Sequence, residues 1–166
     1  MLQPIHPFPA RMAPEIVHRT LETAKPKDRV LDPMCGSGAV IRAAVEHGHS
    51  ALGVDIDPLA VLMSRVWTAP VSPQSLTGDA SAVVTQAQAL QDSDIDVPSD
   101  PETYDFMCYW FAEPQFAQLA RLATVIGRFE NSTKDTLAIC MSRVIITKEM
   151  KAVSYTHLTL PTNREV

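Results

Sequence analysis

Along the first third of the chain, segments with the apolar spacing of helices are followed by short apolar segments typical of strands. The residues after Pro14 predict a helix that ends by Pro26, because four apolar side chains share one face: Ile16, Val17, Leu21 and Ala24. Residues 29–32 (RVLD) predict a short buried strand, and residues 33–38 predict a turn. The next helix should end at Gly48, with its inward face formed by Val40, Ile41, Ala44 and Val45.

The same order of elements repeats in the next forty or so residues. Residues 51–54 predict a second strand, and Asp57-Pro58 predicts the N-cap and first turn of a helix whose apolar face holds Leu59, Leu62, Met63 and Val66. Residues 75–77 predict a third short strand, followed by a helix through residues 83–90. Strands that alternate with helices at this spacing predict an α/β fold with a doubly wound, mainly parallel sheet.

The pattern changes after residue 91. Residues 92–105 are acidic and aperiodic, which predicts a mobile linker between residues 1–91 and a helical insertion at residues 106–152. The insertion should contain two helices, one with Phe116, Leu119, Leu122, Ala123 and Ile126 on its apolar face and one that starts near Ser132.

Residues 153–166 (VSYTHLTLPTNREV) have no helical period and little relation to the preceding sequence. They resemble the peptides that arise when sequencing-adapter DNA is translated, so we expect a non-native tail and exclude it from the fold. An authentic C-terminal strand is the alternative. If the tail is non-native, the natural protein continues past residue 150.

Composition fits a globular protein of one domain, or part of a larger one: 166 residues, 46% hydrophobic and 20% charged. The sequence has no apolar run long enough for a membrane span and no signal-peptide pattern, so we expect a cytoplasmic protein. Cys35, Cys108 and Cys140 are far apart and show no metal-ligand spacing, so no metal is expected. The sequence does not indicate an oligomeric state.

Charge is distributed unevenly along the chain. The net charge is −5, and residues 51–120 carry ten carboxylates against one cation, Arg65. A nucleic-acid-binding surface is usually basic, and this sequence shows no basic patch. A part of a protein that binds only a cofactor need not contact nucleic-acid phosphates. The negative charge therefore weakens the prediction of a nucleic-acid substrate but does not exclude it.

A glycine-rich turn joins the first predicted strand to the helix that follows it. In this turn, Gly36 and Gly38 have no Cβ atom to keep a ligand from the backbone N–H groups. Asp55 lies 19 residues beyond Gly36, after the second predicted strand, where a carboxylate can bind both hydroxyls of a ribose. The pattern predicts an adenosine-containing cofactor.

The charge beside the turn favours one such cofactor. A dinucleotide site has the pattern G-x-G-x-x-G, but Ile41 occupies the position of its third glycine. Asp32 directly precedes the turn and would repel a pyrophosphate, whereas it would attract the ammonium and sulfonium groups of S-adenosylmethionine. We therefore favour S-adenosylmethionine over NAD.

Two segments resemble those of a known family. Residues 32–38 (DPMCGSG) resemble the D-P-[FM]-x-G-[ST]-G cofactor motif of methyltransferases that modify amino groups of DNA or RNA. Residues 6–15 (HPFPARMAPE) resemble the segment from a His-Pro pair to a Pro-Glu pair that precedes that motif in many DNA adenine-N6 and cytosine-N4 methyltransferases. The resemblance covers about residues 5–80 and implies a Rossmann-like class I methyltransferase that uses S-adenosylmethionine and acts on DNA.

The resemblance also implies roles for individual residues. His6 and Phe8 would close over the methionine part of the cofactor, and Asp55 would bind its ribose. Ile56 would lie against the adenine, and Asp79 matches weakly an acidic residue that meets the adenine amino group. The cofactor loop would be formed by Asp32, Pro33, Gly36 and Gly38.

The sequence departs from the family at two points. Ala39 occupies a position where threonine is usual, which removes a hydroxyl but leaves the loop backbone unchanged. The family also needs a [DNS]-P-P-[YFW] motif to orient the substrate amino group and stack on the flipped base, and this sequence contains no Pro-Pro dipeptide. We therefore assign no catalytic residue and expect the chain to hold only the cofactor-binding part of the enzyme, inactive alone. The aromatic residues 109–111 are interpreted as packing within the insertion.

Two other functions fit the sequence. The cofactor motif also resembles that of RNA guanine-N2 methyltransferases, although the short proline-rich N-terminus disfavours them. A nucleotide-binding module without catalytic activity is the alternative from a different class.

Overall fold

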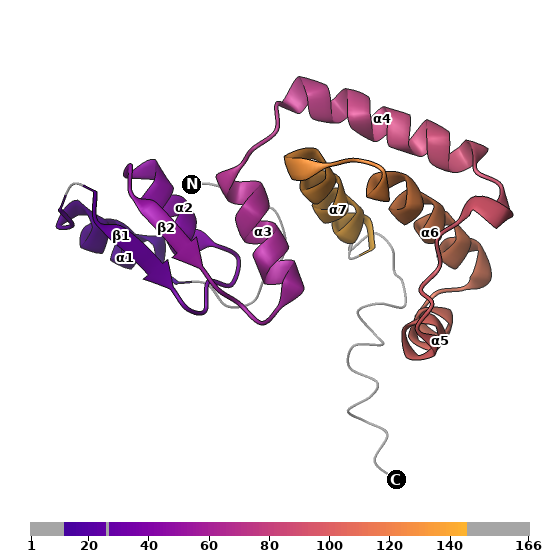
Figure 1. Cartoon of the computed structure of the whole chain (residues 1–166), viewed down its shortest axis with the longest axis horizontal. Helices are drawn as coiled ribbons and strands as arrows, with labels where there is room; N and C mark the ends of the chain where they lie inside the picture. Colours follow the sequence, from indigo (N-terminus) through magenta and orange to yellow (C-terminus); the bar gives the residue numbers. More distant parts are fainter. Residues whose placement is uncertain (1–11, 26, 146–166) are drawn as a thin grey trace, which may run out of the picture. The chain divides into compact units, whose positions relative to one another are not determined.

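A computed structural model describes residues 12–25 and 27–145 of the chain (Figure 1). The chain divides into two compact units, residues 1–71 and residues 72–166. The predictions for the N-terminal arm with His6 and Phe8, for Pro26 and for residues 153–166 lie outside the described residues. Among the described residues, no helix is both long and apolar enough to cross a membrane.

The first unit contains three helices and two strands in its described part. The order is α1 (Pro14–Glu22), β1 (Arg29–Asp32), α2 (Ala39–Glu46), β2 (Ser50–Gly53) and α3 (Pro58–Thr68). The two strands are parallel, and the register pairs Leu31 with Leu52 and Asp32 with Gly53. Parallel pairing brings the carboxyl ends of both strands to the same edge, which is where the candidate site lies.

The core of the first unit lies on one face of the sheet. Val17 and Leu21 of α1 pack with Ala43 and Ala44 of α2, and the inward strand residues Val30 and Ala51 complete the cluster. Leu31 and Leu52 point away from this core and are 64% and 62% exposed. The fold is compatible with the predicted α/β class. However, the described residues form only a two-stranded parallel sheet, not a doubly wound one.

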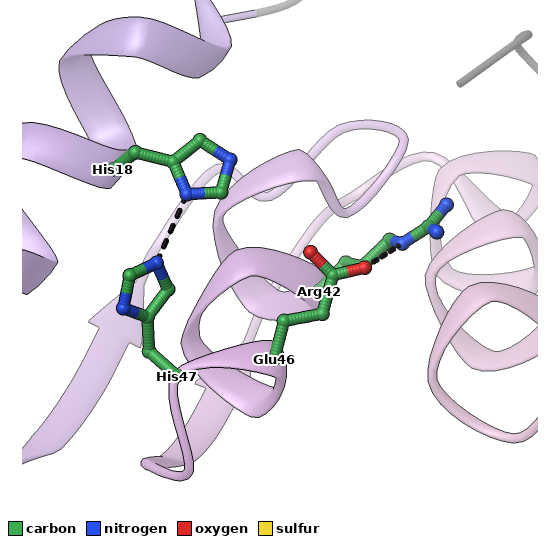
Figure 2. Close-up of polar contacts among 4 residues, drawn as sticks. All are labelled: His18, Arg42, Glu46 and His47. Carbon is green, nitrogen blue, oxygen red and sulfur yellow. Dashed lines mark hydrogen bonds and ion pairs between the residues drawn. The ribbon is translucent and has the colours of Figure 1, made fainter. Parts of the chain in front are cut away.

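Polar contacts between helices supplement this core. His18 Nδ1 of α1 lies 3.0 Å from His47 Nε2 at the end of α2, and within α2 Arg42 Nε lies 2.7 Å from Glu46 Oε1 (Figure 2). The Arg42 guanidinium also lies over the Trp67 ring of α3, 4.1 Å from its centroid. These contacts link α1 to the end of α2 and α2 to α3.

The predicted end of the second helix is confirmed. Gly48 has a positive φ of 78°, and its N–H donates to Val45 O at 2.9 Å, while the His49 N–H donates to Ala44 O at 2.9 Å. These two bonds form a Schellman motif, which caps the last carbonyls of a helix. One detail of the predicted inward face is wrong, because Val45 is exposed and Ala43 is buried in its place.

The predicted strand at residues 75–77 is wrong. These residues lie inside α4 (Pro73–Ala89), together with Gly78 and Asp79. Ser72 is the N-cap of this helix and accepts a hydrogen bond from Ser75 N at 3.3 Å, and Pro73 occupies the first turn. A serine cap followed by proline is a helix start signal, and it outweighs the local strand propensity of the short segment.

The second unit is helical throughout its described part. After α4 come η1 (Asp92–Asp94), α5 (Pro101–Trp110), α6 (Glu113–Gly127) and α7 (Asn131–Ile145). Its core holds Val83 and Ala87 of α4, Val125 and Ile126 of α6, and Leu137 of α7. The two predicted helices of the insertion are present as α6 and α7. The unit starts at Ser72, however, so α4 belongs with these helices and not with the strands.

The predicted linker at residues 92–105 is partly ordered. It contains η1 and the first turn of α5, which Asp100 caps by accepting from Thr103 N at 2.9 Å. The Asp96 N–H donates to Thr124 Oγ1 of α6 at 2.9 Å, and Asp92 pairs with Arg121. A side-chain cap, one hydrogen bond and one ion pair to α6 therefore hold a segment that its composition predicts to be mobile.

The aromatic residues of α5 do not form a buried core. The helix has no buried residue, and Tyr109 is 63% exposed. The Trp110 ring contacts Phe106 and Tyr109, with ring centroids 5.8 and 5.4 Å away. The rings of Tyr109 and Trp110 therefore pack on each other within the predicted insertion, although Tyr109 is largely exposed, and Phe111 is half-buried.

Two glycines provide a matched test of this fold. We expect Gly48→Ala to destabilise the chain by about 1 kcal/mol, because alanine is strained at positive φ. We expect Gly78→Ala to stabilise it by about 1 kcal/mol, since Gly78 lies inside a helix. An added Cβ meets nothing within 4 Å at either site, so backbone conformation alone decides the sign. Urea unfolding of both variants measures the effects, and shifts in the same direction would contradict the assignment.

Candidate functional site

The predicted glycine turn connects β1 to α2. Gly36 and Gly38 have φ angles of 49° and 81°, a left-handed conformation that glycine adopts without strain. The Gly38 N–H donates to Cys35 O at 2.8 Å, and Gly38 is the N-cap of α2. The turn therefore reverses the chain at the carboxyl end of β1, and α2 starts directly after it.

Asp32 is the last residue of β1 and is half-buried. Its Oδ1 accepts a hydrogen bond from Met34 N at 3.2 Å. Asp32 and Gly36 line a pocket of about 270 Å³, which is also lined by Met12 and Ala39. Pro33 lies instead in a groove of about 470 Å³ that is also lined by residues of α1 and β1. The carboxylate thus lies at the end of the first strand, beside the glycine backbone.

Asp55 lies two residues beyond β2 and contacts the same turn. Its Oδ2 accepts from Gly36 N at 2.7 Å, and its Oδ1 accepts from Asp57 N at 3.0 Å. These bonds, led by the one from Asp57 and followed by the one from Gly36, lower the pKa of the Asp55 carboxyl below its ordinary value of 3.8. Each carboxylate oxygen has two lone pairs, so each can still accept a second hydrogen bond. Asp55 is therefore already bonded to the turn but retains acceptors for a ligand.

Gly38 packs closely against α3. A Cβ atom at Gly38 would lie 2.5 Å from Ser64 Oγ and 2.8 Å from Ser64 Cα, which is closer than real atoms approach. Ser64 Oγ also donates to Gly36 O at 3.2 Å. Ser64 is not predicted from the sequence, because a lone serine on the third helix has no local motif and its partner is 28 residues away.

Two apolar side chains near the two carboxylates are exposed to solvent. Ile56, the residue after Asp55, is 99% exposed, and Met34, in the turn, is 83% exposed. Exposed apolar side chains are common at a protein surface, so this observation alone does not identify a ligand. Together with the polar groups beside them, they provide surfaces against which a flat ring could pack.

Several of the predicted site residues lie in the first unit, and one lies in the second. Asp32, Gly36, Gly38, Asp55 and Ile56 all belong to the first unit, within or next to the β1–α2 turn and the end of β2. Asp79 lies in the second unit on α4, where its carboxylate accepts from Ser75 Oγ at 3.4 Å. The described part of the chain contains no group of three or more metal-ligating side chains.

One known protein is similar to most of this chain. The type II methyltransferase M.MvaI of Kocuria varians is 28% identical to it over 131 residues, which cover 75% of this chain. The chain spans 29% of the length of that relative. No family model matches the sequence, and no solved structure matches it. The similarity supports a relationship to methyltransferases.

The hydrogen bond between Asp55 and Gly36 predicts that the Asp55 carboxyl and the Gly36 amide respond to pH together. Because the folded-state pKa of Asp55 is lowered, its stabilising effect is present above the ordinary value of 3.8 and is lost as pH falls through the lowered pKa. We expect the Gly36 amide signal in NMR spectra to shift with the same midpoint as the Asp55 carboxyl carbon. In the Asp55→Asn variant, the pH-dependent shift of the Gly36 amide signal should disappear. A Gly36 amide that titrates unchanged in this variant would show that the bond does not form.

Proposed function

We propose that this chain carries the cofactor-binding part of an S-adenosylmethionine-dependent methyltransferase that modifies an exocyclic amino group of a DNA base. The main support is one contact: the Asp55 carboxylate, beyond the second strand, accepts from Gly36 in the turn after the first. This contact holds the Asp55 carboxylate beside the glycine turn at the carboxyl edge of two parallel strands, an arrangement that would suit a ribose-containing ligand. The similarity to a type II methyltransferase agrees with the proposal.

The residues at this edge suit the chemical groups of S-adenosylmethionine. The Asp32 carboxylate would attract the ammonium and sulfonium groups, with the methionine part in the 270 Å³ pocket. The free lone pairs of Asp55 would accept the ribose hydroxyls, and Ile56 would pack against the adenine. Pro33, Gly36 and Gly38 would shape the loop, and His6, Phe8 and Asp79 are proposed as further contacts on the family resemblance alone.

When bound, the cofactor supplies a methyl group activated by the positive sulfonium. The protein would then have to align that methyl with the acceptor nitrogen and keep water away from the reaction. Asp32 and the loop would hold the donor side of this arrangement. No residue of this sequence is assigned to the acceptor side, because the Pro-Pro-aromatic motif is missing. We therefore propose that the chain transfers no methyl group alone.

A nucleotide-binding module without catalytic activity is the second candidate, and the missing motif favours it. Such a module would need only the turn and Asp55, and it would not require a positively charged ligand. An RNA guanine-N2 methyltransferase would use the same cofactor site and differ only in the substrate. A measurement of cofactor preference therefore distinguishes a nucleotide-binding module from a methyltransferase. A measurement of substrate preference distinguishes a DNA methyltransferase from an RNA methyltransferase.

Calorimetry with S-adenosylmethionine and with NAD tests the proposal. We expect the purified chain to bind S-adenosylmethionine weakly but in preference to NAD. We expect Asp32→Asn to weaken that binding by about threefold to tenfold, since it removes one charge beside a cationic ligand and keeps the side-chain shape. Asp57→Asn is the matched control, because Asp57 caps α3 and does not line the pocket. Preferential binding of NAD, or equal losses in both variants, would refute the methyltransferase assignment.

A further inference from the structure

The two peptide groups that flank the Gly36 Cα are each held by a side chain distant in the sequence. In the peptide between Cys35 and Gly36, the Gly36 N–H donates to Asp55 Oδ2 at 2.7 Å. In the peptide between Gly36 and Ser37, the Gly36 carbonyl accepts from Ser64 Oγ at 3.2 Å. Neither peptide group can rotate without losing its hydrogen bond. These two side chains therefore help to determine how the turn faces the pocket.

Ser64 contacts the turn at two further points. Its Oγ lies 3.5 Å from the Sγ of Cys35, which is buried, and the side chain packs against the Cα of Gly38 so closely that a Cβ there would clash. Three of the four residues from 35 to 38 thus touch this one serine. Because Cys35 and Gly36 also line the 270 Å³ pocket, Ser64 forms part of the support behind that pocket.

The Ser64 hydroxyl differs from other hydroxyls on helices of this chain. Thr68, Thr77, Ser81 and Thr85 each donate to a carbonyl three or four residues earlier in their own helix. Such bonds are a common local alternative for these side chains. Ser64 instead reaches a carbonyl 28 residues away, in the turn.

We infer that Ser64 is a positioning residue of the cofactor loop, which fixes the Gly36–Ser37 peptide in the orientation that receives the ligand. The inference rests on the proposed function, because it takes the turn to be the site of S-adenosylmethionine binding. Ser64 itself would not contact the ligand, since it acts through the Gly36 carbonyl and through Gly38.

The test compares Ser64→Ala with Thr68→Val in the full 166-residue chain. Both variants remove a hydroxyl from α3, but only the first removes a bond to the turn. We expect Ser64→Ala to weaken S-adenosylmethionine binding about threefold to tenfold in calorimetry, as the loss of one hydrogen bond predicts. We also expect it to shift the Gly36 and Ser37 amide signals in the ligand-free NMR spectrum. Thr68→Val should leave both the affinity and these signals unchanged.

Each other outcome has a defined meaning. Unchanged affinity in Ser64→Ala, beside a wild-type chain that binds, would overturn the inference and leave the proposed function intact. A wild-type chain that does not bind S-adenosylmethionine would overturn the proposed function, and the positioning role with it. A Ser64→Ala chain that loses its dispersed amide signals would show that Ser64 supports the fold as a whole and not the turn.

Discussion

The hydrogen bond from the Gly36 N–H to the Asp55 carboxylate joins the two halves of the candidate site. Gly36 belongs to the turn after β1, and Asp55 lies beyond β2, so the bond connects the carboxyl ends of two parallel strands. Because a charged acceptor makes a stronger hydrogen bond than a neutral one, this contact holds the glycine turn more firmly than a backbone carbonyl would. The Gly36 side of the pocket depends on the turn and therefore on this bond, whereas the pairing of β1 with β2 positions Asp32.

The same carboxylate has two roles in this account. In the ligand-free chain Asp55 organises the turn, and in the proposed complex its remaining lone pairs bind the ribose. A site already organised before binding loses less conformational entropy when the ligand arrives. Ser64 contributes to the same organisation through the next peptide group, by its bond to the Gly36 carbonyl. The site thus combines a hydrogen-bonded loop with a second carboxylate, Asp32, which among the described residues accepts from Met34 N within its own turn.

Local signals in the sequence were sufficient to predict β1, the Schellman end at Gly48 and the Asp57 cap of α3, because each depends on neighbouring residues. They were insufficient for residues 75–77, where the Ser72-Pro73 start signal produces a helix. The doubly wound sheet was predicted from strands that alternate with helices. In the described residues this alternation provides two strands, β1 and β2. Ser64 could not be predicted at all, because its role depends on a contact between distant residues.

The most direct measurement is an amide NMR map of the uniformly labelled chain during titration with S-adenosylmethionine. We expect the largest shifts at Gly36, Ser37, Asp55 and Ile56, and unchanged signals from α5 to α7. Shifts concentrated in α5 to α7, or none at saturating ligand, would show that the Asp55–Gly36 contact does not organise a cofactor site.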